Sequence, residues 1–307
     1  MNGPTAVLKV GGELAIDPAS IAAIGSEISA LQAVGFSVVL VHGGGPQLDQ
    51  ALHSLGRSSR RVAGRRVTSQ RDLETAIQVW RGTLSVAWVS GLTQQGVRAC
   101  GICGADGMLL QAHRRPETTM LDDNGQSVSV DFGFVGDVDA VNVEIISTLM
   151  NANIVPVISP LAIDSASGQL LNVNADTVAA AIAAAINADW LVLLSSIPGL
   201  LRELNDPSSR IAKLSLAELP LLIEDGVISG GMRPKVAALM NALRSGVQRA
   251  LILDGRAPVV TKVLVHGHDA GTELHNDPIS VLVNSGSNSN DCRTSSDGIA
   301  EITAHPH

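Results

Sequence analysis

Short runs of β-branched and other apolar residues alternate along this chain with longer segments of helical period. Runs of five or six residues occur at 6–10, 36–41, 154–159 and 190–194. This alternation is typical of βαβ units stacked around a mainly parallel sheet. The nearly continuous apolar run FSVVLV at 36–41 suits an interior strand that is covered by helices on both faces. The pattern therefore predicts an α/β fold, and 307 residues suffice for one large domain or two smaller ones.

Polar residues in front of the helical segments predict where the helices begin. Asp17, followed by a proline, is expected to cap a helix that runs to about Val34. Ser69 is expected to cap a long helix in which Gly82 and Gly91 mark kinks or breaks. Later helices are expected at 175–187, 215–225 and 234–245, and a strand at 249–253 is expected to close the sheet.

An Asn-Gly pair predicts a hairpin that interrupts the βα alternation. Asn124 and Gly125 lie between two extended runs within residues 108–135, and this dipeptide is a strong signal for a two-residue hairpin turn. We expect an antiparallel flap there. After residue 274 the composition shifts to serine, asparagine, aspartate and glycine, so residues 275–307 are expected to form a polar tail that is disordered or loosely docked.

Composition excludes several classes of protein. The chain has 29 acidic and 21 basic residues, a net charge of −8, three phenylalanines, three tryptophans and no tyrosine, so nucleic-acid binding is not expected. The longest apolar run, 178–186, is about half as long as a membrane span, and no export signal precedes the first strand. Three cysteines fit a reducing cytoplasm. Cys100 and Cys103 are interpreted as a buried structural thiol pair.

Two glycine turns follow neighbouring strands. Lys9 lies at the end of the first strand, just before Gly11 and Gly12, and the second strand leads into Gly44 and Gly45. The first turn alone would more often be a plain turn, but N–H groups in such turns can hold an oxyanion. Ligands bind beyond the carboxyl ends of parallel strands, so two turns at one edge predict an elongated anionic ligand. Neither GxxxxGK[ST] nor GxGxxG is matched, which argues against a P-loop NTPase or an ordinary dinucleotide fold.

Three further groups of residues could contact this ligand. Arg66 is favoured as a carboxylate fork, within an arginine cluster that is expected to be mostly solvated. In the phrase NVNAD, helix capping explains Asn174 and Asp176 but leaves Asn172 without a role. A glycine turn opens a later helix with Lys235 in its first turn. A cation there opposes the helix dipole, so this placement favours a phosphate site.

Three other side chains are given mainly structural interpretations. His42 could touch the ligand, although a strand-end histidine that is satisfied by the backbone fits the sequence equally well. Trp80 and Trp88 recur at helical spacing and are interpreted as packing anchors.

Eight ordered motifs resemble the amino acid kinase family, and within it the branch that phosphorylates N-acetyl-L-glutamate. They span about residues 5–274 and read KVGGEL, VHGGGPQL, GRRVT, DFGFVGDV, LNVNADTVAAAIA, IPGLL, IEDGVISGGMRPK and DGR. The resemblance implies a single three-layer α/β/α sandwich over residues 1–274. Its N-lobe, about 1–170, would hold the acyl amino acid with the hairpin as a lid, and its C-lobe, about 171–274, would hold the nucleotide. The tail from 275 has no counterpart in the family.

The resemblance assigns roles to the charged residues one by one. Lys9 resembles the lysine that bridges the transferred phosphoryl group, with Gly11 and Gly12 beneath the phosphates. Lys235 resembles the second lysine, on the nucleotide side. Asp176 matches the acid that organises the two lysines. These three charged residues are the expected catalytic set.

The remaining site residues are also carried over from the resemblance. Gly44 and Gly45 match the turn that receives the substrate, Arg66 the arginine that holds its carboxylate, and Asn172 the polar contact to its acyl group. The positions matched to nucleotide-binding segments are Ser196, Gly199, Leu201, Ser229, Gly230 and Met232. Family members usually have an acid or an asparagine where Ser196 stands, so its nucleotide contact is the least secure of these.

The implied activity is ATP-dependent phosphorylation of the γ-carboxylate of N-acetyl-L-glutamate in arginine biosynthesis. Mg²⁺ would be carried by ATP, with no metal site on the protein. Because arginine-inhibited members carry an additional N-terminal helix, the five residues before Ala6 lead us to expect an arginine-insensitive homodimer rather than a hexamer. The expected location remains the cytoplasm, as the cysteine usage predicts.

Two alternatives stay open at this point. A sister kinase acting on N-acetyl-aminoadipate, or on carrier-linked aminoadipate in lysine biosynthesis, would share the same machinery, and one methylene is worth only ~1–3 kcal/mol in discrimination. A non-catalytic sensor of nucleotide or amino acid could keep the fold, but it would not need Lys9, Asp176 and Lys235 together. Carbamate kinase and glutamate 5-kinase fit the GRRVT motif less well.

Overall fold

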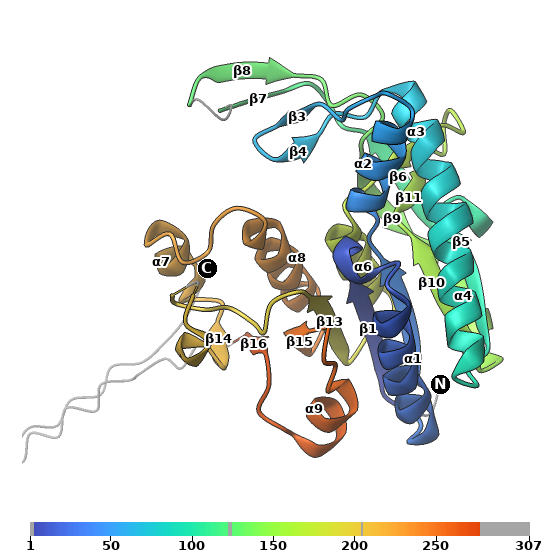
Figure 1. Ribbon diagram of the computed structural model, residues 1–307, viewed down its shortest axis with the longest axis vertical. Coiled ribbons are helices and arrows are strands. Elements are labelled where there is room, and N and C mark those ends of the chain that lie inside the picture. The colour runs from blue at the N-terminus through green and yellow to red at the C-terminus, as the bar shows by residue number, and fades with distance from the viewer. Residues whose placement is uncertain (1–2, 122–124, 204, 277–307) are drawn as a thin grey trace, which may run out of the picture. The chain divides into compact units, whose positions relative to one another are not determined.

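The computed structural model describes residues 3–121, 125–203 and 205–276, which belong to one compact unit (Figure 1). Within this part of the chain an eight-stranded sheet forms the centre, and all its neighbouring strands are parallel except the pair β15 and β16. In spatial order its strands are β14 (Lys213–Ser215), β16 (Thr272–His275), β15 (Arg249–Asp254), β13 (Trp190–Ser195), β1 (Thr5–Val10), β2 (Ser37–His42), β10 (Val155–Ser159) and β5 (Ala99–Cys103).

Helices cover both faces of this sheet, because its interior strands are apolar on both sides. One face packs against α1 (Pro18–Ala33), α4 (Ser85–Gln94) and α9 (Val260–His266). The other packs against α5 (Glu144–Asn151), α6 (Ala175–Ala185), α7 (Leu219–Glu224) and α8 (Met232–Arg244). The predicted three-layer α/β/α sandwich with a mainly parallel sheet is confirmed.

The chain beyond the carboxyl end of β2 forms a third helical group with its own small core of Leu48, Leu52, Leu73 and Trp80. Its elements are α2 (Gly45–Ser54), α3 (Gln70–Ile77) and the π-helical turn η2 (Gln78–Leu84). Short 3₁₀ turns are η1 (Gly12–Leu14), η3 (Asp106–Met108) and η4 (Pro207–Ser209).

The predicted helix starts are confirmed at the two polar caps. The Asp17 carboxylate accepts from the Ser20 N–H at 2.8 Å, and Ser69 forms a capping box with Asp72. Gly82 lies in the π-helical turn, where the helix changes its hydrogen-bond spacing without being interrupted, and the expectation of a kink or break at Gly91 is wrong. A Cβ there would lie 2.2 Å from Ile21 Cγ2, so this glycine instead lets α4 approach α1 closely.

The smaller sheets build the end of the molecule beyond β2. One has the order β12 (Leu170–Asn172), β11 (Leu161–Ile163), β6 (Leu110–Arg114) and β9 (Gly136–Val141), and the two hairpins are β3 (Arg61–Val62) with β4 (Arg65–Arg66), and β7 (Thr118–Leu121) with β8 (Ser127–Val130). The β7–β8 pair confirms the predicted flap, whose Asn124 lies outside the described residues. The two hairpins lie side by side (Figure 1), joined by an apolar cluster that includes Val62, Val130 and Phe132.

Three other expectations are corrected. The sheet does not close at β15, because the short strand β16 adds antiparallel beside it. The helix expected from Ser215 begins at Leu219, since Ser215 ends β14. Cys100 and Cys103 are not a pair: they are three residues apart on β5, where side chains alternate between faces, and they pack against different clusters.

Two further predictions concern the C-terminal tail and membrane-spanning helices. The predicted polar tail lies almost entirely outside the described residues, from residue 277 onward. Within the described ranges, no helix combines the length and the apolar character that crossing a membrane requires.

Candidate active site

Three charged side chains from distant segments meet beyond the carboxyl end of β1. Lys9 shares its side of β1 with Val7, because strand side chains alternate, and this side faces α6 and α8. Its ammonium Nζ lies 2.7 Å from Asp176 Oδ1, in the first turn of α6. Lys235 Nζ, from the first turn of α8, lies 3.5 Å from Asp176 Oδ2. Of the residues predicted to be catalytic, all three are therefore brought together.

The electrostatics of this trio leave one positive charge in excess. The side chains of Lys9 and Asp176 are each only 6% exposed. Burial alone would raise the pKa of Asp176, but the two ammonium groups hold it below its usual value. Burial and the neighbouring Lys9 lower the pKa of Lys235. Asp176 is thus an ionised anchor between two cations, at a helix N-terminus that favours anions.

The two glycine turns lie against each other at this edge of the sheet, as predicted. The Gly43 N–H donates to the Val10 carbonyl at 2.8 Å. A Cβ at Gly12 would lie 2.6 Å from Pro46 Cδ, so no larger residue fits there without displacing the second turn. Gln47 Nε2 donates to the Gly12 carbonyl at 2.7 Å and so ties α2 to the first turn.

Arg66 lies against the second glycine turn. Its Nη2 donates to the Gly45 carbonyl at 3.1 Å, and its Nη1 lies 2.7 Å from Asp49 Oδ1. The Arg66 side chain is 8% exposed. The Nη1 contact with Asp49 is an ion pair whose geometry does not meet that of a hydrogen bond. Asp49 also accepts from Ser59 at 2.6 Å and from Arg61 at 2.8 Å, so sequence reasoning missed a carboxylate that fixes the predicted fork.

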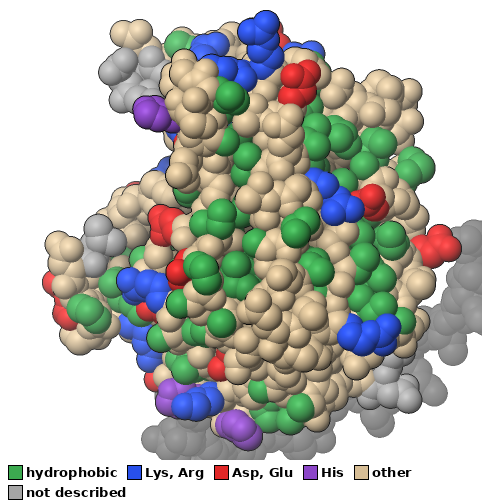
Figure 2. Space-filling view, turned by 45° about the vertical axis from the view of Figure 1, so that its right-hand side comes forward, with side chains coloured by type: hydrophobic (Ala, Val, Ile, Leu, Met, Phe, Trp, Pro, Cys, Tyr) green, Lys and Arg blue, Asp and Glu red, His purple; other side chains and the backbone are tan. Residues whose placement is uncertain are grey.

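The rest of the arginine cluster is mainly surface, as expected. Arg60, Arg61 and Arg65 are exposed, while Arg57 pairs with Asp72 at 2.6 Å. Figure 2 shows lysine and arginine side chains gathered at the end of the molecule where Figure 1 places α3, β3 and β4.

Asn172 is connected to the segment that follows Arg66. Its Nδ2 donates to Thr68 Oγ1 at 3.0 Å, and its N–H donates to the Phe134 carbonyl at 2.9 Å. Asn174 is confirmed as the cap of α6, since its Oδ1 accepts from the N–H groups of Asp176 and Thr177. Residues 172–176 therefore have two separate tasks. The Asn172 side chain is held by Thr68, near Arg66, and Asp176 lies between the two lysines.

The segments predicted to bind nucleotide lie in two places. Ser229, Gly230 and Met232 lead directly into the turn of α8 that carries Lys235. Ser196, Gly199 and Leu201 follow β13, and this loop is held to β16, because Thr272 Oγ1 accepts from the Leu200 N–H at 2.8 Å. Gly199 has φ +142°, and a Cβ there would lie 2.7 Å from that hydroxyl oxygen, so the position requires glycine.

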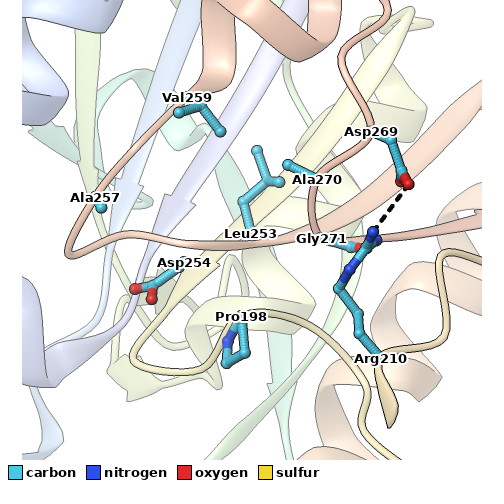
Figure 3. A pocket seen from close by; sticks show the side chains of 9 residues that line it. All are labelled: Pro198, Arg210, Leu253, Asp254, Ala257, Val259, Asp269, Ala270 and Gly271. Atoms are coloured by element: carbon cyan, nitrogen blue, oxygen red, sulfur yellow. Dashed lines mark hydrogen bonds and ion pairs between the residues drawn. The ribbon is translucent and has the colours of Figure 1, made fainter. Parts of the chain in front are cut away.

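A cavity of about 260 Å³ adjoins this loop (Figure 3). Pro198 lies on one side of it, Leu253 and Asp254 at the end of β15 on another, and Arg210 pairs with Asp269 across its rim at 3.0 Å. Carboxyl ends of parallel strands are the usual place for ligands in such sheets. Pro198 and Asp254 belong to the motifs IPGLL and DGR, whereas no local sequence pattern marks Arg210 or Asp269.

His42 and Trp80 support the second glycine turn from inside the protein. His42 is fully buried, with Nδ1 2.9 Å from the Gly43 carbonyl oxygen and Nε2 3.0 Å from Ser159 Oγ. Both ring nitrogens of His42 therefore have hydrogen-bond partners inside the protein, which agrees with the structural interpretation of this residue. Trp80 is a packing anchor as predicted, and its indole Nε1 also donates to the Gly44 carbonyl at 2.9 Å.

The burial of His42 predicts an acid-sensitive stability. Burial lowers its pKa to about 4, against ~6.5 in an unfolded chain. Because the folded protein resists protonation, its free energy of unfolding should fall as pH drops from about 6.5 toward 4, by about 3 kcal/mol in all. Urea unfolding at pH 7 and pH 4.5 measures this. His42→Gln should lose much of this pH dependence of the free energy of unfolding. His53→Gln, at an exposed position on α2, should keep it. If the free energy of unfolding changed equally with pH in both variants, His42 would not be the cause.

Comparison with known proteins places this geometry among related sequences and structures. The model of the amino acid kinase family matches residues 4–254. The acetylglutamate kinase of Methanosphaera stadtmanae is 40% identical over 250 residues, covering 81% of this chain and 84% of that protein. The acetylglutamate kinase of Heliobacterium modesticaldum is 39% identical over 257 residues, covering 84% and 86%.

Solved structures give the same fold at lower identity. N-acetylglutamate synthase from Neisseria gonorrhoeae, complexed with coenzyme A and N-acetyl-glutamate, has a TM-score of 0.74 at 24% identity, covering 91% of this chain and 61% of that one. Carbamate kinase from Giardia lamblia bound to AMP-PNP has a TM-score of 0.63 at 16% identity, covering 90% and 99%. At these identities the likeness concerns the fold.

Proposed function

This chain belongs to the amino acid kinase family, and we propose that it transfers the γ-phosphoryl group of ATP to the γ-carboxylate of N-acetyl-L-glutamate, as in arginine biosynthesis. Relatives named acetylglutamate kinase, about 40% identical over most of both chains, support this choice of acceptor. The observation that carries the proposal is the trio in which buried Asp176 pairs with buried Lys9 and with partly exposed Lys235, beside two glycine turns.

This reaction depends on electrostatic stabilisation of the transferring group more than on proton transfer. A side-chain carboxylate with a pKa near ~4.3 is already ionised at neutral pH, so the acceptor needs no general base. Its attack on phosphorus brings two anions together, and fixed cations and N–H donors must stabilise the charge on the transferring group. Lys9 would bridge that group, and Lys235 would act from the nucleotide side.

The acceptor would lie along the edge formed by α2, β4 and β12. The N–H groups of Gly44 and Gly45, at the start of α2, would bind its γ-carboxylate, since the first N–H groups of a helix lack partners within it. Arg66 would hold its other carboxylate, and Asn172 would contact the acyl group. Apart from Asn172, the residues that would bind the acceptor lie within about 1–170, and apart from Gly11 and Gly12, those that would bind the nucleotide lie within about 171–274.

ATP would extend from the lysines into the C-terminal half. Gly11 and Gly12 would lie beneath its phosphates, with Ser196, Gly199, Leu201, Ser229, Gly230 and Met232 along its other parts. Mg²⁺ would neutralise phosphate charge. Both oxygens of Asp176 lie close to lysine ammonium groups, so we propose that phosphate oxygens and water would hold that ion.

Replacing Arg66 by alanine should weaken acceptor binding selectively. Losing a charged hydrogen bond to a carboxylate should raise KM for N-acetyl-L-glutamate roughly 10- to 100-fold, while KM for ATP changes little. Initial-rate kinetics with each substrate varied in turn measure the split. Arg60→Ala, at an exposed arginine of the same cluster, serves as the control. An unchanged acceptor KM in Arg66→Ala would remove Arg66 from the acceptor site.

The proposal is tested by ADP release with Mg²⁺-ATP and N-acetyl-L-glutamate, alongside calorimetric titration of ATP. Turnover that depends on the acceptor supports it. ATP binding without ADP release would favour a sensor of the same fold. We further propose that the protein is cytoplasmic and that it forms a homodimer. Light scattering of the full chain tests the dimer, and a monomeric mass would contradict it.

A further inference from the structure

A π-helical turn places Trp80 against the second glycine turn. In η2 the Ser85 N–H donates to the Trp80 carbonyl, five residues back, instead of the four-residue spacing of an α-helix. Such turns shift the side chains that follow and often occur at functional sites. Trp80 is 3% exposed and lies in the cluster with Leu48 and Leu84. The helix is thus irregular where one side chain must reach the edge of the sheet.

The Trp80 ring lies directly on Gly44. A Cβ at Gly44 would be 2.4 Å from Trp80 Cδ1 and 2.5 Å from Nε1, and Nε1 donates to the Gly44 carbonyl at 2.9 Å. At Gly45 the nearest atom to an added Cβ is Arg66 Nη2, at 4.0 Å. The indole therefore packs tightly against the turn at Gly44, whereas an added Cβ at Gly45 would meet Arg66 Nη2 only at ordinary contact distance.

The carbonyl groups of this turn are fixed one after the other. The Gly43 carbonyl meets His42 Nδ1, and the Gly44 carbonyl accepts from both the Leu48 N–H and the Trp80 indole. In a planar trans peptide, C=O and the following N–H point in opposite directions. A carbonyl fixed toward the interior therefore aims the next N–H outward: His42 sets the Gly44 N–H, and Trp80 sets the Gly45 N–H.

From this geometry we propose that Trp80 is a positioning residue, which holds the Gly44–Gly45 peptide so that the Gly45 N–H faces the acceptor carboxylate. The inference rests on the proposed function, because that function gives the turn its ligand. Ser159 reinforces the arrangement: its Oγ lies 3.2 Å from the Trp80 carbonyl oxygen and 3.0 Å from His42 Nε2. Rotation of this one peptide would remove a donor from the acceptor site.

The chain offers a matched control in Trp88. Trp88 on α4 is fully buried, and its indole N–H has no hydrogen-bond partner among the described residues. Trp80→Phe and Trp88→Phe therefore make the same chemical change inside the protein, but only the first removes a bond to the turn. A purely structural role for Trp80 would make the two variants behave alike.

Steady-state kinetics and amide hydrogen exchange of the full chain test the proposal. Trp80→Phe should raise KM for N-acetyl-L-glutamate about tenfold, leave KM for ATP unchanged, and speed exchange of the Leu48 amide, which shares the Gly44 carbonyl. Trp88→Phe should do none of these. Equal acceptor KM and equal Leu48 exchange in the two variants would overturn the role of Trp80. A wild-type chain without turnover would contradict the proposed function, and Leu48 exchange would still decide whether Trp80 holds the turn.

Discussion

Replacing Lys9 by alanine should lower kcat by ~100-fold or more, the usual effect of removing a charge that stabilises a transition state. Lys9 lies 2.7 Å from Asp176 and is nearly buried. Without it, the trio with Asp176 and Lys235 loses its excess positive charge, at the point where negative charge gathers during phosphoryl transfer. ADP release at saturating substrates measures the loss.

A control variant and a second active-site variant accompany Lys9→Ala. Lys213→Ala removes an exposed lysine from β14 and should leave kcat unchanged. Lys235→Ala should also lower kcat by ~100-fold, because both cations act on the transferring group. Circular dichroism and thermal melts confirm that each variant is folded. Near-normal turnover in Lys9→Ala or Lys235→Ala would remove that lysine from the mechanism.

Replacing Asp176 by asparagine should reduce both stability and turnover. The amide keeps the shape of the side chain but leaves the buried Lys9 ammonium and the partly exposed Lys235 ammonium without their anion. Breaking a buried ion pair in this way costs about 3–5 kcal/mol, and misplaced lysines should lower kcat by ~100-fold. Urea unfolding and ADP release measure the two effects.

The pH dependence of Asp176→Asn identifies the cause of its instability. Burial and Lys9 already lower the pKa of Lys235 when Asp176 is present, and losing the carboxylate lowers it further. A folded state that binds fewer protons than the unfolded chain gains stability as pH rises. Part of the lost free energy of unfolding should therefore return between pH 7 and pH 10. Asp225→Asn, at an exposed site, should match the wild type throughout; a pH-independent defect in Asp176→Asn would contradict the electrostatic explanation.

The parts of the site that could be predicted lie at ends of regular elements. Lys9 follows from a buried strand that ends in glycines, and Lys235 from a helix that opens with a cation. Asn174 was recognisable as a cap, because capping depends on residues two or three positions away. The role of Asp176 as their shared anchor came only from the family resemblance, since no local pattern shows that two lysines converge on it.

The features that escaped prediction depend on tertiary contacts or on helix register. Hydrophobic periodicity cannot reveal the π-helical turn that carries the Trp80 indole to Gly44, 36 residues away in the chain. In the sequence, nothing distinguishes Asp49 from other acidic residues on a helix. Its role follows from its contact with Arg66, which exists only in the folded chain. Gly91 permits contact between two helices, and β16 is a short strand whose place is fixed by pairing with β15.

Trapping the acyl phosphate tests the central claim most directly. The full chain is incubated with Mg²⁺-ATP and hydroxylamine, in parallel with N-acetyl-L-glutamate, N-acetyl-L-aminoadipate and free L-glutamate, and the hydroxamate formed is measured. We expect much more hydroxamate with N-acetyl-L-glutamate than with either of the other two acceptors. Selective product with N-acetyl-L-aminoadipate, or no product with any acceptor despite bound ATP, would contradict it.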